Sequence, residues 1–213
     1  IKEAWLSNLA RLEVCSQKGL VERFDSTIGR ASVLMPLGGK NQLTPVEGMV
    51  ANIPALSDKV QTASVMTFGY NPEIACWSPF YGAFYAVLES VCRAVALGAN
   101  PETIRLSLQE YFEKMLTEDS WGLPFAALLG AYLAQVGLDI PAIGGKDSMS
   151  GTFMDMHVPP TLVSFAAAAV PTEDIVSNEF KKANSRVVFL CCEKNECDLP
   201  DFGELKLQFA AIH

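Results

Sequence analysis

The sequence predicts an α+β domain in which a mixed β-sheet is covered on one face by two apolar helices. Strand patterns outnumber helix patterns and do not alternate with them regularly, as they would in a doubly wound fold. Two helical segments are almost entirely apolar, which is typical of helices that pack on a sheet. No glycine-rich dinucleotide fingerprint follows the first expected strand.

The segments before the sheet are expected to be helical. Residues 2–13 place their apolar side chains near helical spacing, and a shorter helix follows over 16–24. Residues 31–37 then predict a strand that ends at two glycines. Residues 40–58 carry turn formers and little periodicity, which favours a long loop.

The central segment predicts a strand followed by the strongest helix of the chain. Residues 60–68 are rich in Thr, Val and Ser, as strands often are. Residues 79–97 repeat apolar side chains at i, i+3, i+4, i+7, i+8 and i+11 from Phe84, which makes one stripe. Ser78 can cap this helix at its start, and Gly98 suits the position after its end.

Three strands and a second apolar helix complete the expected domain. Residues 103–108 alternate as a strand, and 124–135 form the helix. Residues 138–143 predict a buried strand that leads into a turn, and 161–170 predict a long, nearly uncharged strand. Beyond it the chain is polar, with a new strand pattern at 186–191 and a final helix at 204–212.

Composition limits the classes of function. Half of the 213 residues are apolar and 19% are charged, which supports a sizeable core and argues against disorder. The formal net charge of −8 disfavours nonspecific nucleic-acid binding. No uninterrupted apolar run reaches membrane-spanning length, and six scattered cysteines form no disulfide framework. We therefore expect a reduced, cytoplasmic protein with no nucleic-acid or membrane partner.

The segment 144–150 carries the residue types that suit phosphate chemistry. Two glycines allow a ligand to approach the backbone, Lys146 neutralises phosphate charge, Asp147 can hold a hard metal ion and Ser148 donates or accepts hydrogen bonds. The run is not a Walker A loop, because an aspartate follows the lysine. An ordinary turn with a solvated Lys-Asp pair explains the same residues equally well.

Two further groups of polar residues have both a structural and a functional interpretation. Glu89 and Arg93 are four apart on the strongest helix, so they form an ordinary ion pair or direct a carboxylate to a phosphate-bound metal. Residues 24–30 form a turn, or they meet an anionic ligand together with Lys18.

Six segments, in order along the chain, share the pattern of one enzyme family. They are residues 5–12, 15–18, 23–25, 89–99, 136–141 and 145–150, and the last, Gly-Lys-Asp-Ser-Met-Ser, is the most specific. They resemble the second half of the synthetase region of phosphoribosylformylglycinamidine synthase, in its large bacterial form. The resemblance covers most of residues 5–170.

The resemblance implies an architecture like the N-terminal domain of aminoimidazole ribonucleotide synthetase. That domain is a mixed four-stranded sheet with helices packed on one face, and two such sheets pair into a barrel-like dimer. Residues 1–175 would form this domain, 176–185 a linker, and 186–213 the truncated start of a following α/β domain. The chain is then an inactive fragment, which we expect to form a homodimer because its exposed sheet lacks the other half.

The resemblance also implies an activity. The family uses ATP and glutamine to convert formylglycinamide ribonucleotide to the amidine in purine biosynthesis. ATP activates the formamide oxygen, ammonia from a glutaminase domain displaces the phosphate, and magnesium offsets the charge. ATP and magnesium are the expected cofactors. The expected partners are the first synthetase half, the glutaminase domain and the ribonucleotide substrate.

Site residues follow from the matching positions. The resemblance assigns nucleotide or substrate binding to Gly144, Gly145, Lys146, Ser148, Lys18 and Asp25, and metal binding to Asp147, Glu89 and Asp58. Arg93 stands where the family usually has asparagine. Two alternatives stay open: another ATP-using enzyme of the superfamily, similar to thiamine-phosphate kinase or selenophosphate synthetase, and a non-catalytic scaffold half with a structural nucleotide.

Overall fold

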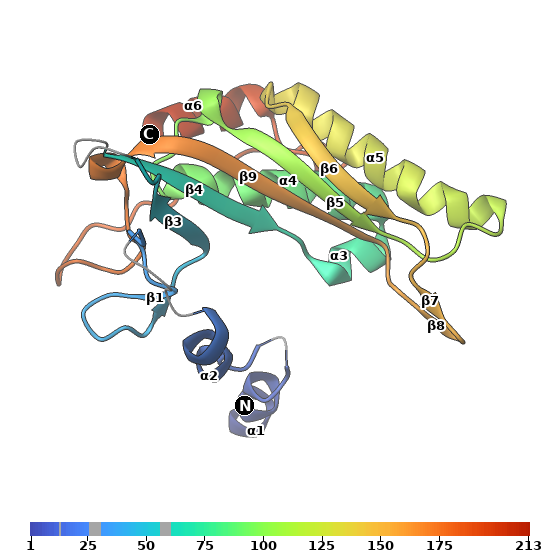
Figure 1. Ribbon diagram of the computed structural model, residues 1–213, viewed down its shortest axis with the longest axis horizontal. Helices are drawn as coiled ribbons and strands as arrows, with labels where there is room; N and C mark the ends of the chain where they lie inside the picture. Colours follow the sequence, from blue (N-terminus) through green and yellow to red (C-terminus); the bar gives the residue numbers. More distant parts are fainter. Residues whose placement is uncertain (13, 26–30, 56–60) are drawn as a thin grey trace.

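A five-stranded sheet with two long helices on one face forms the centre of the molecule (Figure 1). The computed structural model describes residues 1–12, 14–25, 31–55 and 61–213. Neighbouring strands pair antiparallel except for the last two, which are parallel, so the sheet is mixed as predicted. In spatial order the strands are β3 (Gly48–Asn52), β4 (Thr62–Gly69), β9 (Thr161–Pro171), β5 (Arg105–Tyr111) and β6 (Ala142–Ser148).

The predicted count of four strands is wrong because β3 is an additional edge strand. It lies within residues 40–58, where turn formers favoured a loop. Its five residues pair antiparallel with β4, and Val50 at its centre is buried. A short edge strand of this kind depends on its partner more than on its own pattern, so the sequence does not reveal it.

The helices that cover the sheet are α4 (Pro79–Ala96) and α5 (Glu118–Leu138), with the short α3 (Pro72–Trp77) before them. The apolar stripe and both ends of α4 are confirmed: Ser78 accepts a hydrogen bond from the Tyr81 amide, and Gly98 has φ 102°. The η2 turn (Pro101–Thr103) leads from α4 into β5.

Close packing of α4 against β4 and against α5 requires a glycine in each neighbour. A Cβ atom on Gly69 would lie 2.0 Å from the carbonyl oxygen of Ala86, and one on Gly130 would lie 2.0 Å from that of Phe80. Alternate residues of β9, including Ser164 and Ala166, are fully buried under the helices. The core therefore lies between one face of the sheet and α4 and α5, and no described helix covers the other face.

The helix α5 is longer than the predicted 124–135. Thr117 and Ser120 form a capping box that starts it earlier, and Asp139 in a left-handed conformation ends it. Pro124, the first residue of the predicted helix, lies inside α5. By length and composition α5 could cross a membrane, yet a third of that window is buried and the helix packs on α4, as core helices do.

The N-terminal segment contains little of the predicted structure. It comprises α1 (Lys2–Leu9), α2 (Lys18–Leu20), a π-helical turn η1 (Val21–Asp25) and a small hairpin of β1 (Leu37–Gly38) and β2 (Thr44–Pro45). Figure 1 shows α1 and α2 away from the two sheet-covering helices, and α1 buries no residue. The predicted strand over 31–37 is wrong, because residues 31–36, all of which the structure describes, form a single isolated bridge at Ser32.

The segment after β6 contains a β-hairpin and a final helix. The hairpin pairs β7 (Thr152–Phe153) with β8 (Met156–His157), and η3 (Thr172–Asp174) follows β9. The strand predicted over 186–191 is not formed, since no described strand pairs with it. The predicted last helix is confirmed as α6 (Phe202–Ile212), which buries Leu205 and Phe209 against the core.

Candidate functional site

The residues singled out at 144–148 lie in the edge strand β6, not in a turn. The strand runs parallel to β5 and pairs Gly145 with Leu108, Lys146 with Gln109, Asp147 with Glu110 and Ser148 with Tyr111. The expectation of a turn is therefore wrong, because pairing with β5 overrides the turn preference of Gly, Asp and Ser. One long edge of this strand carries no neighbour in the described sheet.

The two glycines of this strand differ in their surroundings. A Cβ atom on Gly145 would lie 2.5 Å from the carbonyl oxygen of Leu108, so a side chain would force β5 and β6 apart. A Cβ atom on Gly144 would meet nothing within 4 Å. Gly145 is thus needed for strand pairing, and Gly144 leaves the backbone open to a ligand.

Strand geometry divides the predicted binding residues between two faces. Successive side chains of a strand point to opposite sides, so Lys146 and Ser148 share one face and Asp147 lies on the other. The ammonium of Lys146 lies 4.2 Å from the ring centroid of Tyr111, on the face opposite the helices. Lys146 and Asp147 therefore do not form the simple solvated pair that an ordinary turn would give.

Asp147 shares the helix-bearing face with Glu110, a residue that the sequence analysis missed. The pKa of Glu110 is raised above its ordinary value, mainly because burial disfavours the charged form and also because the Asp147 carboxylate repels it. Both line a cleft of about 300 Å³, together with Leu108, Gly144, Gly145 and Lys146. Two carboxylates that repel each other in a cleft favour a bound cation.

No signal in the sequence identifies Glu110, because the apolar alternation of residues 103–108 ends at Leu108. The strand β5 extends to Tyr111, and its parallel register with β6 brings Glu110 beside Asp147. The pair is not a complete ligand set: among the described residues, no three His, Cys, Asp or Glu side chains come close enough to hold a metal ion.

Both carboxylate oxygens of Glu89 have hydrogen-bond donors beside them. Its two oxygens accept hydrogen bonds from the Tyr70 amide at 2.9 Å and from the Arg93 guanidinium at 2.8 Å. Arg93 also donates to the Glu47 carboxylate at 2.8 Å and to the Phe68 carbonyl at 2.7 Å, and it lies over the Phe68 ring. The ordinary ion-pair interpretation of Glu89 and Arg93 is therefore confirmed, within a larger cluster.

The structure does not bring the other predicted residues to β6. Glu89 lies beside the end of β4, and β9 and β5 separate β4 from β6, a distance of about 14 Å at normal strand spacing. Lys18 lies in α2 and pairs with Glu22 at 3.5 Å. The side chain of Asp25 and the whole of Asp58 lie outside the described residues.

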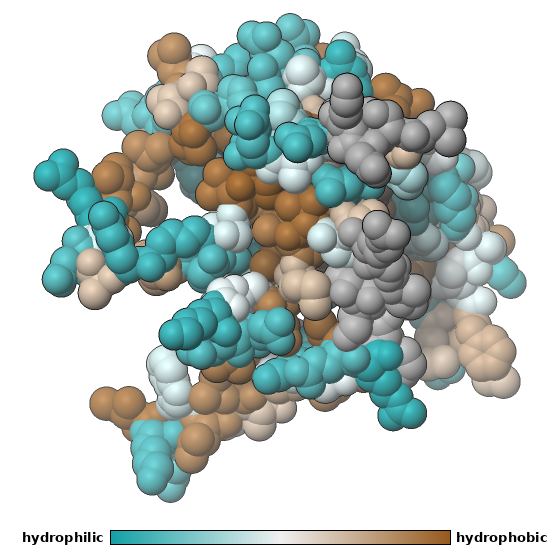
Figure 2. Space-filling model, turned by 60° about the vertical axis from the view of Figure 1, so that its left-hand side comes forward, coloured by the Kyte–Doolittle hydropathy of each residue, from teal (hydrophilic) through white to brown (hydrophobic). Residues whose placement is uncertain are grey.

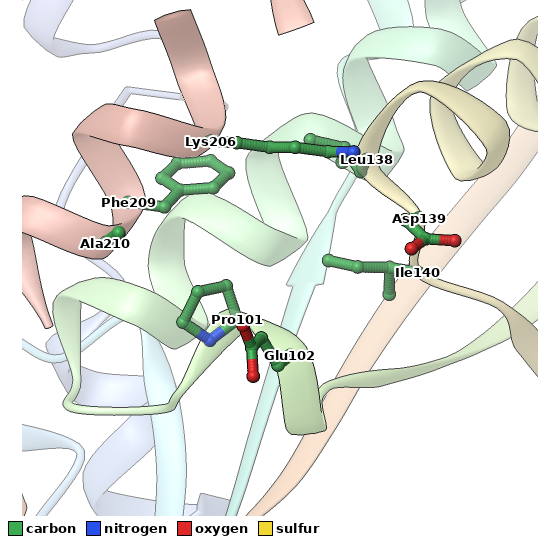
Figure 3. Close-up of a pocket in the computed structure, with 8 residues that line it drawn as sticks. All are labelled: Pro101, Glu102, Leu138, Asp139, Ile140, Lys206, Phe209 and Ala210. Atoms are coloured by element: carbon green, nitrogen blue, oxygen red, sulfur yellow. The ribbon is translucent and has the colours of Figure 1, made fainter. Parts of the chain in front are cut away.

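A different cleft, of about 360 Å³, opens at the far end of β6. Apolar side chains such as Phe209 and Ile140 line it, and Glu102 and Asp139 stand at its margin (Figure 3). Lys206 extends from α6 across it toward Leu138 (Figure 3). None of the residues predicted from the sequence lines this cleft.

The fold is an α+β domain with a mixed five-stranded sheet, and its candidate site lies on the edge strand β6. No protein-family model matches the chain. The structure aligns with Thermotoga maritima PurL complexed with AMPPCP at a TM-score of 0.63 and 18% identity, covering 80% of this chain and 27% of that one.

The resemblance to phosphoribosylformylglycinamidine synthase is confirmed by sequence as well: the chain is PurL-like. It is 28% identical over 109 residues to the synthase subunit PurL of Picrophilus torridus, covering 51% of this chain and 14% of the relative. It is 21% identical over 193 residues to that of Thermoplasma acidophilum, covering 89% and 24%. The chain spans about a quarter or less of the length of these relatives.

Proposed function

We propose that this chain is part of an ATP-dependent ligase that converts formylglycinamide ribonucleotide to the amidine, with glutamine as the nitrogen donor. The observation that carries the proposal is similarity to PurL along 89% of the chain. Structures of Thermotoga maritima PurL in complex with ATP, ADP and FGAR support the proposed ligands. The cellular setting we propose is the cytoplasm.

In this proposal the open edge of β6 forms one wall of a nucleotide and substrate site. Gly144 presents backbone without a side chain, so a phosphate can approach closely, and Gly145 stays a proposed contact beside it. Lys146 and Ser148 lie on the same face and would supply the positive charge and the hydroxyl that bind it. Lys18 and Asp25 stay proposed ligand contacts that the N-terminal segment would contribute.

The residues present fit a magnesium ion at Asp147 better than at Glu89. Asp147 and Glu110 repel each other across the parallel register, and both offer the hard oxygens that magnesium prefers. Glu89 has both oxygens occupied by protein donors. When bound, magnesium would offset negative charge on the phosphate groups. Asp58 stays a proposed ligand.

The larger enzyme would complete the site. The open face of the sheet exposes Met49, Met66 and Phe68, each more than 40% exposed, and Phe165 joins them along a cleft of about 280 Å³. Apolar residues gather at the centre of the surface in Figure 2, between hydrophilic segments. We propose that the first synthetase half covers this face in the enzyme, and that a second copy covers it in the fragment.

The domain boundaries belong to the same proposal. Residues 1–175 form the synthetase domain, 176–185 the linker, and 186–213 the start of the next domain. The glutaminase part and the first half would lie elsewhere in the enzyme. The fragment alone would be inactive.

Turnover by the longer enzyme tests the proposed function. Phosphate release from ATP is measured with ammonia as nitrogen source, with and without formylglycinamide ribonucleotide. We expect release only when the ribonucleotide is present, together with formation of the amidine. ATP hydrolysis that is independent of this ribonucleotide would contradict the assignment.

A non-catalytic scaffold half is the second candidate, and the Arg93 cluster favours it. The guanidinium supplies a permanent positive charge where Glu89 would otherwise be free to bind metal. Calorimetry of the fragment with ADP and magnesium is expected to detect weak or no binding, because half of the site is absent. Micromolar affinity would overturn that expectation and would favour a structural nucleotide in this half.

A further inference from the structure

The helix α5 carries an apolar stripe on the face turned away from the core. Its six members lie at i, i+4, i+7, i+8, i+11 and i+15, and each is between 44% and 63% exposed: Trp121, Phe125, Leu128, Leu129, Tyr132 and Val136. The stripe spans an arc of about 100° around the helix. No charged residue occurs between Asp119 and Asp139. A helix that is apolar on every side is normally covered on every side.

A protein surface fits this stripe better than a bilayer does. The opposite side of α5 is fixed to α4 through small residues, and Gly130 lies directly against the backbone of Phe80. The helix cannot enter a membrane without leaving that contact. Its ends carry Glu118, Asp119 and Asp139, whereas surface-bound helices rely on lysine and arginine.

The stripe has the same spacing in both directions along the helix. A two-fold axis between Leu128 and Leu129 exchanges Phe125 with Tyr132 and Trp121 with Val136. Self-complementarity of this kind is what a symmetric dimer interface requires. The six side chains also form two rows at i, i+4 spacing, and such rows interdigitate when two helices cross at about 50°.

We propose that α5 is a homotypic docking surface, on which a second copy of this chain packs its own α5 antiparallel. The exposed parts of the six side chains amount to about 600 Å² per copy, or about 1,200 Å² for the pair. This area is at the lower limit of specific interfaces, so a dissociation constant in the micromolar range is expected.

The acidic ends of the helix are compatible with this arrangement. The axis places Glu118 of one copy toward Asp139 of the other, which would repel if the helices were parallel to within a few degrees. Crossing at about 50° moves the ends of a helix about 30 Å long apart by more than a Debye length. The remaining repulsion is screened by salt, so association is retained or strengthened as ionic strength rises.

Sedimentation equilibrium of the 213-residue chain, over about 1 to 100 µM, tests the proposal. Leu128→Glu places two carboxylates beside the axis and should weaken association about 100-fold, with an unchanged circular dichroism spectrum. Leu207→Glu, at an exposed leucine of α6 outside the stripe and the sheet face, is the matched control and should leave association unchanged. Because the open sheet face is itself a proposed contact, the comparison is repeated with Met66→Glu in each chain: Met66→Glu alone should retain the α5 dimer, and the variant that combines it with Leu128→Glu should be monomeric.

Photo-crosslinking identifies the contact without reliance on folding of the charged variant. A benzoylphenylalanine at position 125 is excited in a mixture of isotopically labelled and unlabelled chains. Cross-links between labelled and unlabelled residues 118–139 support the proposal. Cross-links to any other segment, a wild-type monomer at about 100 µM, or recovery on lipid vesicles instead of self-association would each overturn it.

Discussion

Replacement of Arg93 by methionine tests whether one guanidinium holds β3, β4 and α4 together. Methionine keeps the apolar stem of this mostly buried side chain but removes its donors to Glu47, Glu89 and the Phe68 carbonyl. The two ion pairs are partly exposed and contribute about 0.5 kcal/mol each. The charged hydrogen bond to the carbonyl contributes about 1.5 kcal/mol, and the contact with the Phe68 ring about 0.5 kcal/mol.

Arg93→Met should therefore lower the free energy of unfolding by about 3 kcal/mol, which lowers Tm by roughly 6 to 12 °C for a chain of this size. Urea unfolding followed by circular dichroism measures it. Glu47→Gln is the control: Glu47 is largely exposed, so this change should cost under about 1 kcal/mol. A loss below about 1 kcal/mol in the arginine variant would refute the role of the cluster.

Two further predictions concern β6 and its neighbour. Gly145→Ala should destabilise by about 1 to 3 kcal/mol in thermal unfolding, because its Cβ meets the Leu108 carbonyl, whereas Gly144→Ala should be nearly neutral; equal costs would contradict the register. The raised pKa of Glu110 favours its neutral form in the fold, so the stability that it contributes is full below the ordinary carboxyl pKa and is lost as pH rises through the raised value. Glu110→Gln should thus be more stable than wild type at pH 7 and equal to it below about pH 4. A Glu110→Gln variant that is less stable than wild type at pH 7 would contradict the raised pKa of Glu110.

Periodic segments could be predicted from the sequence because one face of each is buried against a large surface. The apolar stripe from Phe84 and the cap at Ser78 located α4 to within a residue. The nearly uncharged run of 161–170 likewise located β9, the central strand. In both, local pattern and tertiary packing favour the same structure.

Segments whose structure depends on a distant partner could not be predicted. The strand β6 contains turn-forming residues and pairs only because β5 offers a parallel edge. Glu110 was missed for the same reason, since its neighbour Asp147 is defined by that pairing. Conversely, residues 186–191 have a strand pattern, but no described strand pairs with them. The structure of β6, the placement of Glu110 and the conformation of residues 186–191 all depend on which strands pair in the sheet.

The sequence alone could not show on which face of β6 each side chain lies. The sequence presents Lys146, Asp147 and Ser148 as one polar cluster. Extended geometry separates Asp147 from the other two and pairs it with Glu110. The proposed phosphate contacts and the proposed metal ligand therefore reach the open edge of β6 from its two faces, and a phosphate bound at that edge would meet both.

The activity of Asp147→Ala in the longer enzyme tests the proposed site most directly. Ribonucleotide-dependent phosphate release is compared with that of wild type and of Asp155→Ala, a control change at a nearby exposed aspartate. We predict a loss of at least about 100-fold for Asp147→Ala, with an unchanged Tm, and near-normal activity for the control. Wild-type turnover by a folded Asp147→Ala enzyme would contradict the role of this strand.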